Sequence, residues 1–168
     1  MAQNPGDAGY RPAPAADSGF SVRRATPADA AAVAALVRDA FETEVAAYGT
    51  DLPALRETPA IVNGAIQRGI VLVAEQDGRI VGSVRGELTV DGTCLVGRLV
   101  VLPETRRAGI ARILAIEIER LFPDARRYEL FTGHLSAGPL ALYESLGYRR
   151  FREERVSPTT VLIYLEKP

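Results

Sequence analysis

The sequence predicts a three-layer α+β fold in which about four helices flank a mixed sheet of about seven strands. Two Asp-Gly dipeptides, at 77–78 and 91–92, lie between apolar runs, and this dipeptide is typical of tight turns between antiparallel strands. An amphipathic helix separates the strand predicted over 94–102 from the strand predicted over 127–132. Because a strand–helix–strand crossover makes its strands parallel, we expect antiparallel order early in the sheet and one parallel pair at its centre.

Composition indicates a single domain preceded by a tail. Of the 168 residues, 47% are hydrophobic and 24% are charged, which is ordinary for a globular domain with a sizeable core. Residues 1–19 are mostly Ala, Pro, Gly, Asp and Asn and have little to bury, so we expect a disordered N-terminal tail there. The domain itself is predicted over 20–168.

Two helices are predicted in the first part of the domain. Thr-Pro pairs at 26–27 and 58–59 have the N-cap and first-turn residues that begin helices, and apolar residues follow each pair at helical spacing. The first helix is expected to end near residue 42, and Gly69 ends the second. The segment 42–58 mixes acids, Gly and Pro, which favours a loop with a short helical piece.

Seven strands follow from apolar, β-branched runs and the turns between them. They are predicted over residues 20–24, 70–75, 80–88, 94–102, 127–132, 148–155 and 159–165. The third helix starts at Gly109, and the fourth extends from Ser136 to Gly147 with a proline in its first turn. The last two strands are expected to form a hairpin around Ser157-Pro158.

The turn between the strand over 94–102 and the third helix has the chemistry of an anion site. Helix starts favour Asp and Glu, because the helix dipole is positive there, yet this one has arginines and small residues. A turn of this kind needs a small residue in any case, but a diphosphate would account for the charge as well. The residues expected to hold the phosphates are Arg106, Arg107, Ala108, Gly109, Ile110, Ala111 and Arg112.

The same segment resembles the signature of the GNAT superfamily of N-acetyltransferases. Residues 106–111, Arg-Arg-Ala-Gly-Ile-Ala, are similar to the family's Arg/Gln-x-x-Gly-x-Gly/Ala turn, which holds the pyrophosphate of acetyl-CoA. Residues 142–148, Leu-Tyr-Glu-Ser-Leu-Gly-Tyr, resemble its second block, and 22–29 resembles its usual start. The resemblance spans about residues 21–166 and implies a GNAT-like acyl-CoA N-acyltransferase fold with acetyl-CoA as co-substrate.

The resemblance also implies roles for individual residues. Tyr143 matches the tyrosine that protonates the departing thiolate, although helical spacing alone favours a core aromatic. Leu99, Val100 and Val101 match the positions whose backbone groups bind the pantetheine arm and stabilise the oxyanion. Ser136 stands where many relatives have an asparagine that contacts the cofactor, and the alternative role is that of a helix N-cap.

The sequence departs from its relatives at the general base and at one turn residue. Phe131 stands where some bacterial protein acetyltransferases have a glutamate, so Glu87 and His134 are the best remaining candidates, each of which also suits a structural role. Arg107 replaces a glycine common in the turn, which fits if residue 107 avoids positive φ. Acids in the segment that usually shapes the substrate cleft are Glu42, Glu44 and Asp51.

Two classes of function follow. The first is an enzyme that transfers the acetyl group of acetyl-CoA by direct attack of a primary amine, on a small molecule or a peptide or protein, without a metal. The second is a catalytically inactive acyl-CoA-binding regulatory or interaction domain. A net charge of −1 and the lack of a long apolar run give no indication of a nucleic-acid or membrane partner. The lone Cys94 suits a cytoplasmic location, and a homodimer stays open.

Overall fold

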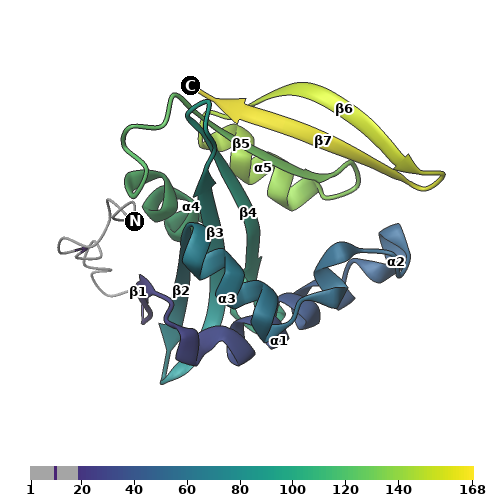
Figure 1. Cartoon of the computed structure of the whole chain (residues 1–168). Coiled ribbons are helices and arrows are strands. Elements are labelled where there is room, and N and C mark those ends of the chain that lie inside the picture. Colours follow the sequence, from purple (N-terminus) through teal and green to yellow (C-terminus); the bar gives the residue numbers. More distant parts are fainter. Residues whose placement is uncertain (1–9, 11–18) are drawn as a thin grey trace.

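The computed structural model describes Tyr10 and residues 19–168, whose strands form one seven-stranded sheet (Figure 1). The order across the sheet is β1-β2-β3-β4-β5-β7-β6. The strands are β1 (Ser21–Arg24), β2 (Ile70–Gln76), β3 (Arg79–Leu88), β4 (Thr93–Val101), β5 (Arg127–Gly133), β6 (Arg149–Ser157) and β7 (Thr160–Lys167). The β4–β5 pair is parallel and the other neighbours are antiparallel, which confirms the predicted mixed sheet.

The described residues form five α-helices. They are α1 (Ala30–Glu42), α2 (Val45–Tyr48), α3 (Pro59–Arg68), α4 (Ile110–Arg120) and α5 (Ala137–Ser145). Short 3-10 turns cover Pro27–Asp29, Pro53–Arg56 and Pro103–Thr105. The single-turn α2 is the helical piece expected within 42–58. The Thr58 hydroxyl accepts a hydrogen bond from the Ile61 N–H at 3.2 Å, which confirms the predicted cap of α3.

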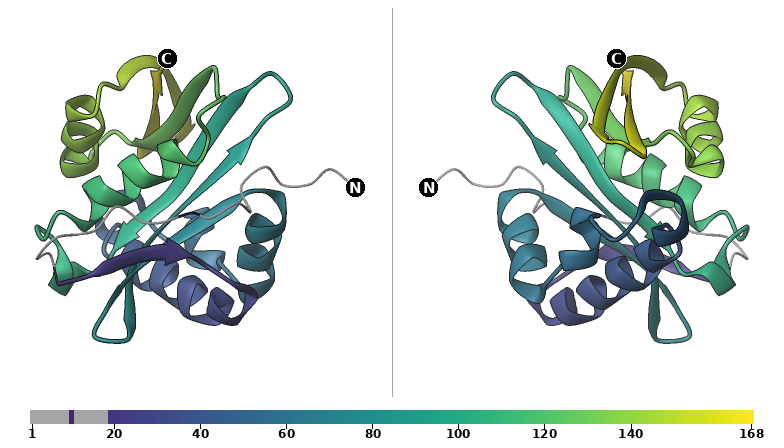
Figure 2. Two further views of the ribbon diagram at one scale, coloured as in Figure 1. Left: turned by 90° about the vertical axis from the view of Figure 1, so that its left-hand side faces the viewer. Right: turned by 90° about the vertical axis from the view of Figure 1, so that its right-hand side faces the viewer.

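Helices cover both faces of the strands β1 to β4 (Figures 1 and 2). Helices α1 and α3 pack on one face and α4 on the other. Gly86 of β3 marks the α4 face, because a Cβ there would lie 2.6 Å from the ring of Phe122. Ile110, Leu114 and Ile118 of α4 are at most 2% exposed, and burying each contributes about 1.5–3 kcal/mol. The sheet is therefore packed on both faces, with α1 and α3 on one and α4 on the other.

The apolar stripe of α3 is narrower than the sequence predicts. The apolar residues that follow Thr58-Pro59 at helical spacing are Ile61, Val62, Ala65 and Ile66, and this spacing predicts that all four are buried. Only Val62 and Ala65 are buried, and Ile61 is 43% exposed. Residues three apart share one helical face, whereas their immediate neighbours point about 100° away. Helix α1 and the sheet both contact the face of α3 that carries Val62 and Ala65. Ile61 and Ile66 therefore lie at the edges of this contact.

Most of the predicted tail lies outside the described residues. Tyr10 is described, and its hydroxyl donates to the Glu117 carboxylate of α4 at 3.0 Å. Burial raises the pKa of this phenol, and the hydrogen bond to Glu117 adds to the effect. Among the described residues, no helix has the length and apolar character needed to cross a membrane.

Candidate functional site

The β4 and β5 strands pair over only three residues and then diverge. The pairs are Thr93 with Arg127, Cys94 with Tyr128, and Leu95 with Glu129. Further along, β5 pairs with β7 while β4 pairs with β3. Within the described sheet, the β4 edge that faces β5 therefore has no strand partner over residues 96–101. Unpaired backbone donors and acceptors of this kind are available to a ligand.

The positions expected to bind the pantetheine arm, residues 99–101, lie on this unpaired edge. The register with β3 shifts at Arg98, which has φ of 49°. The Leu102 N–H donates to the Val81 carbonyl of β3 at 2.8 Å. Because backbone groups alternate in direction along an antiparallel strand, the N–H and C=O of Val101 turn the other way, toward β5. Buried apolar side chains and an open backbone edge thus coexist here.

The predicted phosphate turn, residues 106–109, connects the end of β4 to α4. All four of these residues are exposed. Gly109 has φ of 79°, and a Cβ there would meet no described atom within 4 Å. Glycine is therefore required for the left-handed backbone and not for lack of space. The turn leaves the first N–H groups of an 11-residue helix facing outward, as anion binding requires.

Arg107 does not meet the condition under which an arginine was expected to fit the turn, namely that residue 107 avoids positive φ. Its φ is 72°, so two residues of the turn, Arg107 and Gly109, are left-handed. A residue with a Cβ pays roughly 1–2 kcal/mol in this conformation. The backbone geometry thus matches a turn that carries glycine at position 107, and the surrounding fold holds the arginine in that geometry.

The arginines of the turn have no carboxylate partner among the described residues. Arg106 donates to the Thr43 hydroxyl at 3.5 Å, at the end of α1. Arg112 donates to the Ser145 hydroxyl at 3.0 Å, at the end of α5. Their positive charge adds to that of the helix start, and within the described part of the chain no ion pair offsets it. The Arg112 contact also brings the turn next to the helix that carries Tyr143.

Tyr143 is buried, yet its hydroxyl makes no hydrogen bond within the described part of the chain. Its side chain belongs to a residue that is 7% exposed, and burial raises the pKa of the phenol above its usual value of about 10. Buried tyrosine hydroxyls normally find a partner. The other five tyrosines do so in this structure: Tyr10, Tyr48, Tyr128, Tyr148 and Tyr164. Tyr143 therefore keeps a protonated, unused donor.

Ser136 does not cap α5, which rules out the alternative role considered for it. Its side chain makes no cap bond, and its hydroxyl lies 2.8 Å from the Tyr48 hydroxyl and 3.4 Å from the Glu44 carboxylate. The Leu135 N–H donates to Tyr48 at 2.8 Å. Gly133 is small because a Cβ there would overlap the Tyr48 ring. Tyr48, missed in the sequence, thus fastens α2 to the connection between β5 and α5.

The two base candidates lie apart. Glu87 of β3 pairs with Arg68 of α3 at 3.5 Å, on the α3 side of the sheet. His134 follows β5, and its Nδ1 lies 3.2 Å from both the N–H and the carbonyl of Val161 in β7. The structure does not bring them together.

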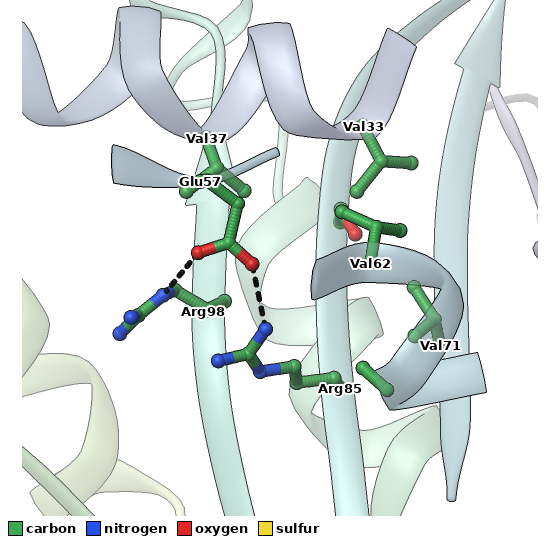
Figure 3. A pocket seen from close by; sticks show the side chains of 9 residues that line it. Val33, Val37, Glu57, Val62, Val71, Arg85 and Arg98 are labelled. Carbon is green, nitrogen blue, oxygen red and sulfur yellow. Dashed lines mark hydrogen bonds and ion pairs between the residues drawn. The ribbon is translucent and has the colours of Figure 1, made fainter. Parts of the chain in front are cut away.

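A buried carboxylate, also missed in the sequence, lies on the face opposite α4 (Figure 3). Glu57 is 2% exposed and accepts from Arg85 Nη1 at 2.7 Å and from Arg98 Nε at 3.1 Å. These residues share a small hollow with Val33 and Val62. Glu57 precedes Pro59 in an irregular segment, so no periodicity indicated its burial.

The fold and the site define an acyl-CoA-dependent transferase, and a family comparison agrees. The sequence model of the family described as "Acetyltransferase (GNAT) domain" matches residues 67–150, half of the chain. The chain therefore belongs to the GNAT acetyltransferase family and is an acetyl-CoA-dependent acyltransferase. No curated protein sequence matches it.

Solved structures share the fold. A ribosomal-protein-alanine N-acetyltransferase from Brucella melitensis has 22% identity and a TM-score of 0.69 over 87% of this chain and 98% of that one. The yncA protein of Salmonella typhimurium, solved with acetyl-CoA, has 17% identity and a TM-score of 0.70 over 89% and 93%. PaiA N-acetyltransferase from Thermoplasma acidophilum, solved with coenzyme A, has 14% identity and a TM-score of 0.72 over 86% and 97%.

Proposed function

We propose that this protein transfers the acetyl group of acetyl-CoA to a primary amine, on a small molecule or on a peptide or protein, by direct attack. The observation that carries the proposal is the grouping of three unsatisfied features. These are the uncompensated arginines of the turn, the unpaired β4 edge and the free Tyr143 hydroxyl. Among the described residues the arginines have no carboxylate partner, and the β4 edge and the Tyr143 hydroxyl have no hydrogen-bond partner. Acetyl-CoA has a complementary group for each.

Different residues of the site would bind successive parts of acetyl-CoA. The N–H groups at the start of α4, with Arg106, Arg107 and Arg112, would hold the diphosphate. The backbone of residues 99–101 would bind the arm and stabilise the developing oxyanion, a contribution of roughly 3–4 kcal/mol per donor in other acyl transfers. Acetyl-CoA supplies an activated thioester carbonyl. Ser136 stays a candidate cofactor contact through its hydroxyl.

Tyr143 would give its proton to the departing thiolate. Because burial raises its pKa, the phenol is protonated throughout the physiological range and is ready to act as an acid. Cys94 is unsuited to a covalent intermediate, since burial raises the pKa of its thiol to about 12. Direct attack by the amine therefore fits better than a two-step route through an acylated cysteine.

The amine must lose a proton before it attacks. We keep Glu87 and His134 as the candidate bases, each acting directly or through water. Glu87 lies on the face opposite α4, where its carboxylate pairs with Arg68. His134 is held by Val161, which fixes its ring while leaving Nε2 for another partner. A buried free thiol suits the reducing cytoplasm, where we place this activity.

The test is to incubate the protein with acetyl-CoA and a panel of amines, polyamines and peptides while monitoring free thiol. We expect free thiol to be released only when an amine is present, and the final amount of thiol to equal the amount of the limiting substrate. Mass spectrometry of the acceptor should show one added acetyl group. Acetyl-CoA binding without amine-dependent thiol release for any acceptor would contradict the proposal and favour the non-catalytic acyl-CoA-binding domain.

A further inference from the structure

The Glu57 cluster lies on the side of the sheet from which an acceptor would approach. The phosphate turn begins α4, so a bound acetyl-CoA would reach the gap between β4 and β5 from the α4 side. Ser83 and Arg85 of β3 point to the opposite face, where α1 and α3 pack. An attacking amine must come from a direction that the cofactor arm leaves free. The hollow beside Arg85 and Arg98 opens on that face.

Arg98 places a guanidinium next to the proposed acetyl position. It belongs to the unpaired stretch of β4 and immediately precedes residues 99–101. The register shift at this point puts Arg98 and Leu99 together opposite Val84, and this bulge turns the Arg98 side chain toward Glu57. Figure 3 shows its guanidinium pointing away from Val33 and Val62. The charged group therefore lies on the side of the hollow away from these valines.

The charges of the cluster do not cancel. One carboxylate, Glu57, faces two guanidinium groups whose side chains are only 20% and 28% exposed. Arg38 adds a further positive group and donates to the Glu57 backbone carbonyl. Burial is the main reason that the pKa of Arg85 is lowered, and the nearby Arg98 and Arg68 add to the effect while Glu57 opposes it. Excess charge in a partly buried place is unfavourable unless an anion joins it.

Arg98 also retains the geometry that recognises an anion. Among the described residues its side-chain bond to Glu57 uses Nε, which leaves both Nη groups without a protein partner. Neither Nη group is fully enclosed, so both are open to solvent. Two parallel N–H donors form the fork that binds a carboxylate in a bidentate manner. Glu57 thus fixes the orientation of the arginine and leaves its outer donors free.

We propose that the acceptor amine carries a carboxylate close to the amine and that Arg98, with Arg85 beside it, binds this group. The proposal rests on the acetyl transfer proposed above. Free amino acids fit best, because their carboxylate is attached to the carbon that bears the amine. A peptide N-terminus has a neutral carbonyl in the same position, so it lacks the group that Arg98 would bind.

The experiment compares the common L-amino acids with their primary carboxamides. The carboxamides have the same side chain and amine but lack the negative charge of the carboxylate. Acetyl transfer is measured as kcat/KM per unprotonated amine, because the carboxamide also lowers the pKa of the amine. In parallel, calorimetry measures the binding of each compound to the protein saturated with coenzyme A. We expect at least one amino acid to exceed its carboxamide by roughly 100-fold, as expected for a desolvated charge pair.

Substitutions test whether Arg98 causes the preference for amino acids over their carboxamides. Arg98→Gln should reduce the preference for the acid to less than about tenfold, mainly through KM, and Arg98→Lys should retain part of it. Arg79→Gln is the control, since Arg79 is an exposed, ion-paired arginine of the same strand as Arg85 and takes no part in the cluster. This control should keep the full preference. Coenzyme A affinity and melting temperature are measured for every variant to confirm that it is folded.

The outcomes separate this inference from the proposed function. Rapid acetylation of amides or peptides without a preference for acids would overturn the carboxylate site while acetyl transfer stands, and this comparison needs only the wild-type protein. Binding of an amino acid that depends on Arg98, without any acetyl transfer, would support the site and contradict the function. Neither binding nor transfer of any acid would overturn the carboxylate site, and it would contradict the proposed function as well if no amide, polyamine or peptide in the panel were acetylated.

Discussion

Tyr143 and Tyr148 lie five residues apart and pack edge to face, with ring centroids separated by 5.9 Å, yet their hydroxyl groups differ in hydrogen bonding. Both are buried, at 7% and 3% exposure. The Tyr148 hydroxyl donates to the Glu119 carboxylate at 2.8 Å, and Lys167 holds the same carboxylate at 2.6 Å. The Tyr143 hydroxyl has no partner within the described residues. A filled hydrogen bond indicates a structural group. The Tyr143 hydroxyl is an unused donor that is not fully enclosed, although its ring is buried, so it is available to a ligand.

The same contrast separates the arginines. Arg85 and Arg98 have a buried acid supplied by the chain itself, and the turn arginines have none among the described residues. The outer Nη groups of Arg98 are an exception, because its bond to Glu57 uses only Nε. Function is therefore expected to depend most on the donors that the fold leaves free, and stability on those that it satisfies. Substitutions can test this division one group at a time.

The largest expected effect is that of Tyr143→Phe on the chemical step. The change removes one hydroxyl and keeps the ring that packs against Tyr148. Since general acids contribute roughly 100- to 10,000-fold, single-turnover acetyl transfer should slow by at least about 100-fold. Rapid mixing isolates this step from product release. Acetyl-CoA affinity and melting temperature should change little, and a wild-type single-turnover rate would make Tyr143 a packing residue.

Gly109→Glu should weaken acetyl-CoA binding by roughly 100-fold, because it places a negative charge where the turn would hold the diphosphate. The space around Gly109 is open, so the fold should tolerate the side chain. Gly109→Ala is the control, since it introduces the same left-handed strain without the charge. Calorimetry measures both. Equal affinities in wild type and Gly109→Glu would refute the role of the turn.

Tyr148→Phe should reverse the pattern seen for Tyr143. Losing a hydrogen bond to a charged acceptor costs about 2 kcal/mol, which lowers the melting temperature of a chain this size by roughly 4–8 °C. Turnover should stay within about threefold of wild type, because the ring still supports Tyr143. Calorimetric melting and the thiol assay test this together. A large loss of turnover at unchanged stability would show that the two tyrosines act as one unit.

The smallest expected effect is that of Arg107→Gly, and its two consequences have opposite signs. Removing the Cβ at φ of 72° should stabilise the fold by about 0.5–1 kcal/mol, after the entropy that glycine adds to the unfolded chain. Losing the guanidinium should weaken acetyl-CoA binding by a few fold. Arg107→Lys keeps the charge and the strain, so it should leave stability unchanged. A destabilised Arg107→Gly would show that its side chain makes a stabilising contact.

Much of the fold could be predicted because turn residues and hydrophobic periodicity in the sequence favour the same strands and helices that the structure contains. Two Asp-Gly turns fixed the antiparallel strands, and the change from strand to helix periodicity located the turn before α4. The left-handed Arg107 was missed for the opposite reason, since local preference argues against that conformation in any residue but glycine. Only the tertiary structure overrides it.

The acceptor face could not be predicted because it depends on long-range register. Glu57, Arg85 and Arg98 come from three separate segments, with no spacing that links them. Side chains alternate between the faces of a strand, and the bulge at Arg98 shifts that alternation by one residue. A sequence pattern indicates that a strand exists but does not show where its register slips. Similarly, nothing local showed that Tyr48 would reach Ser136.

The position of β7 between β5 and β6 has a consequence for biosynthesis. Since β6 pairs with β7 and β7 with β5, β6 is joined to the sheet through a strand that the ribosome makes after it. Until β7 emerges, β5 presents an open edge of the kind that promotes aggregation, and β6 has nothing to pair with. The sheet is therefore completed only after β7 has been synthesised, and loss of β7 alone would release two strands.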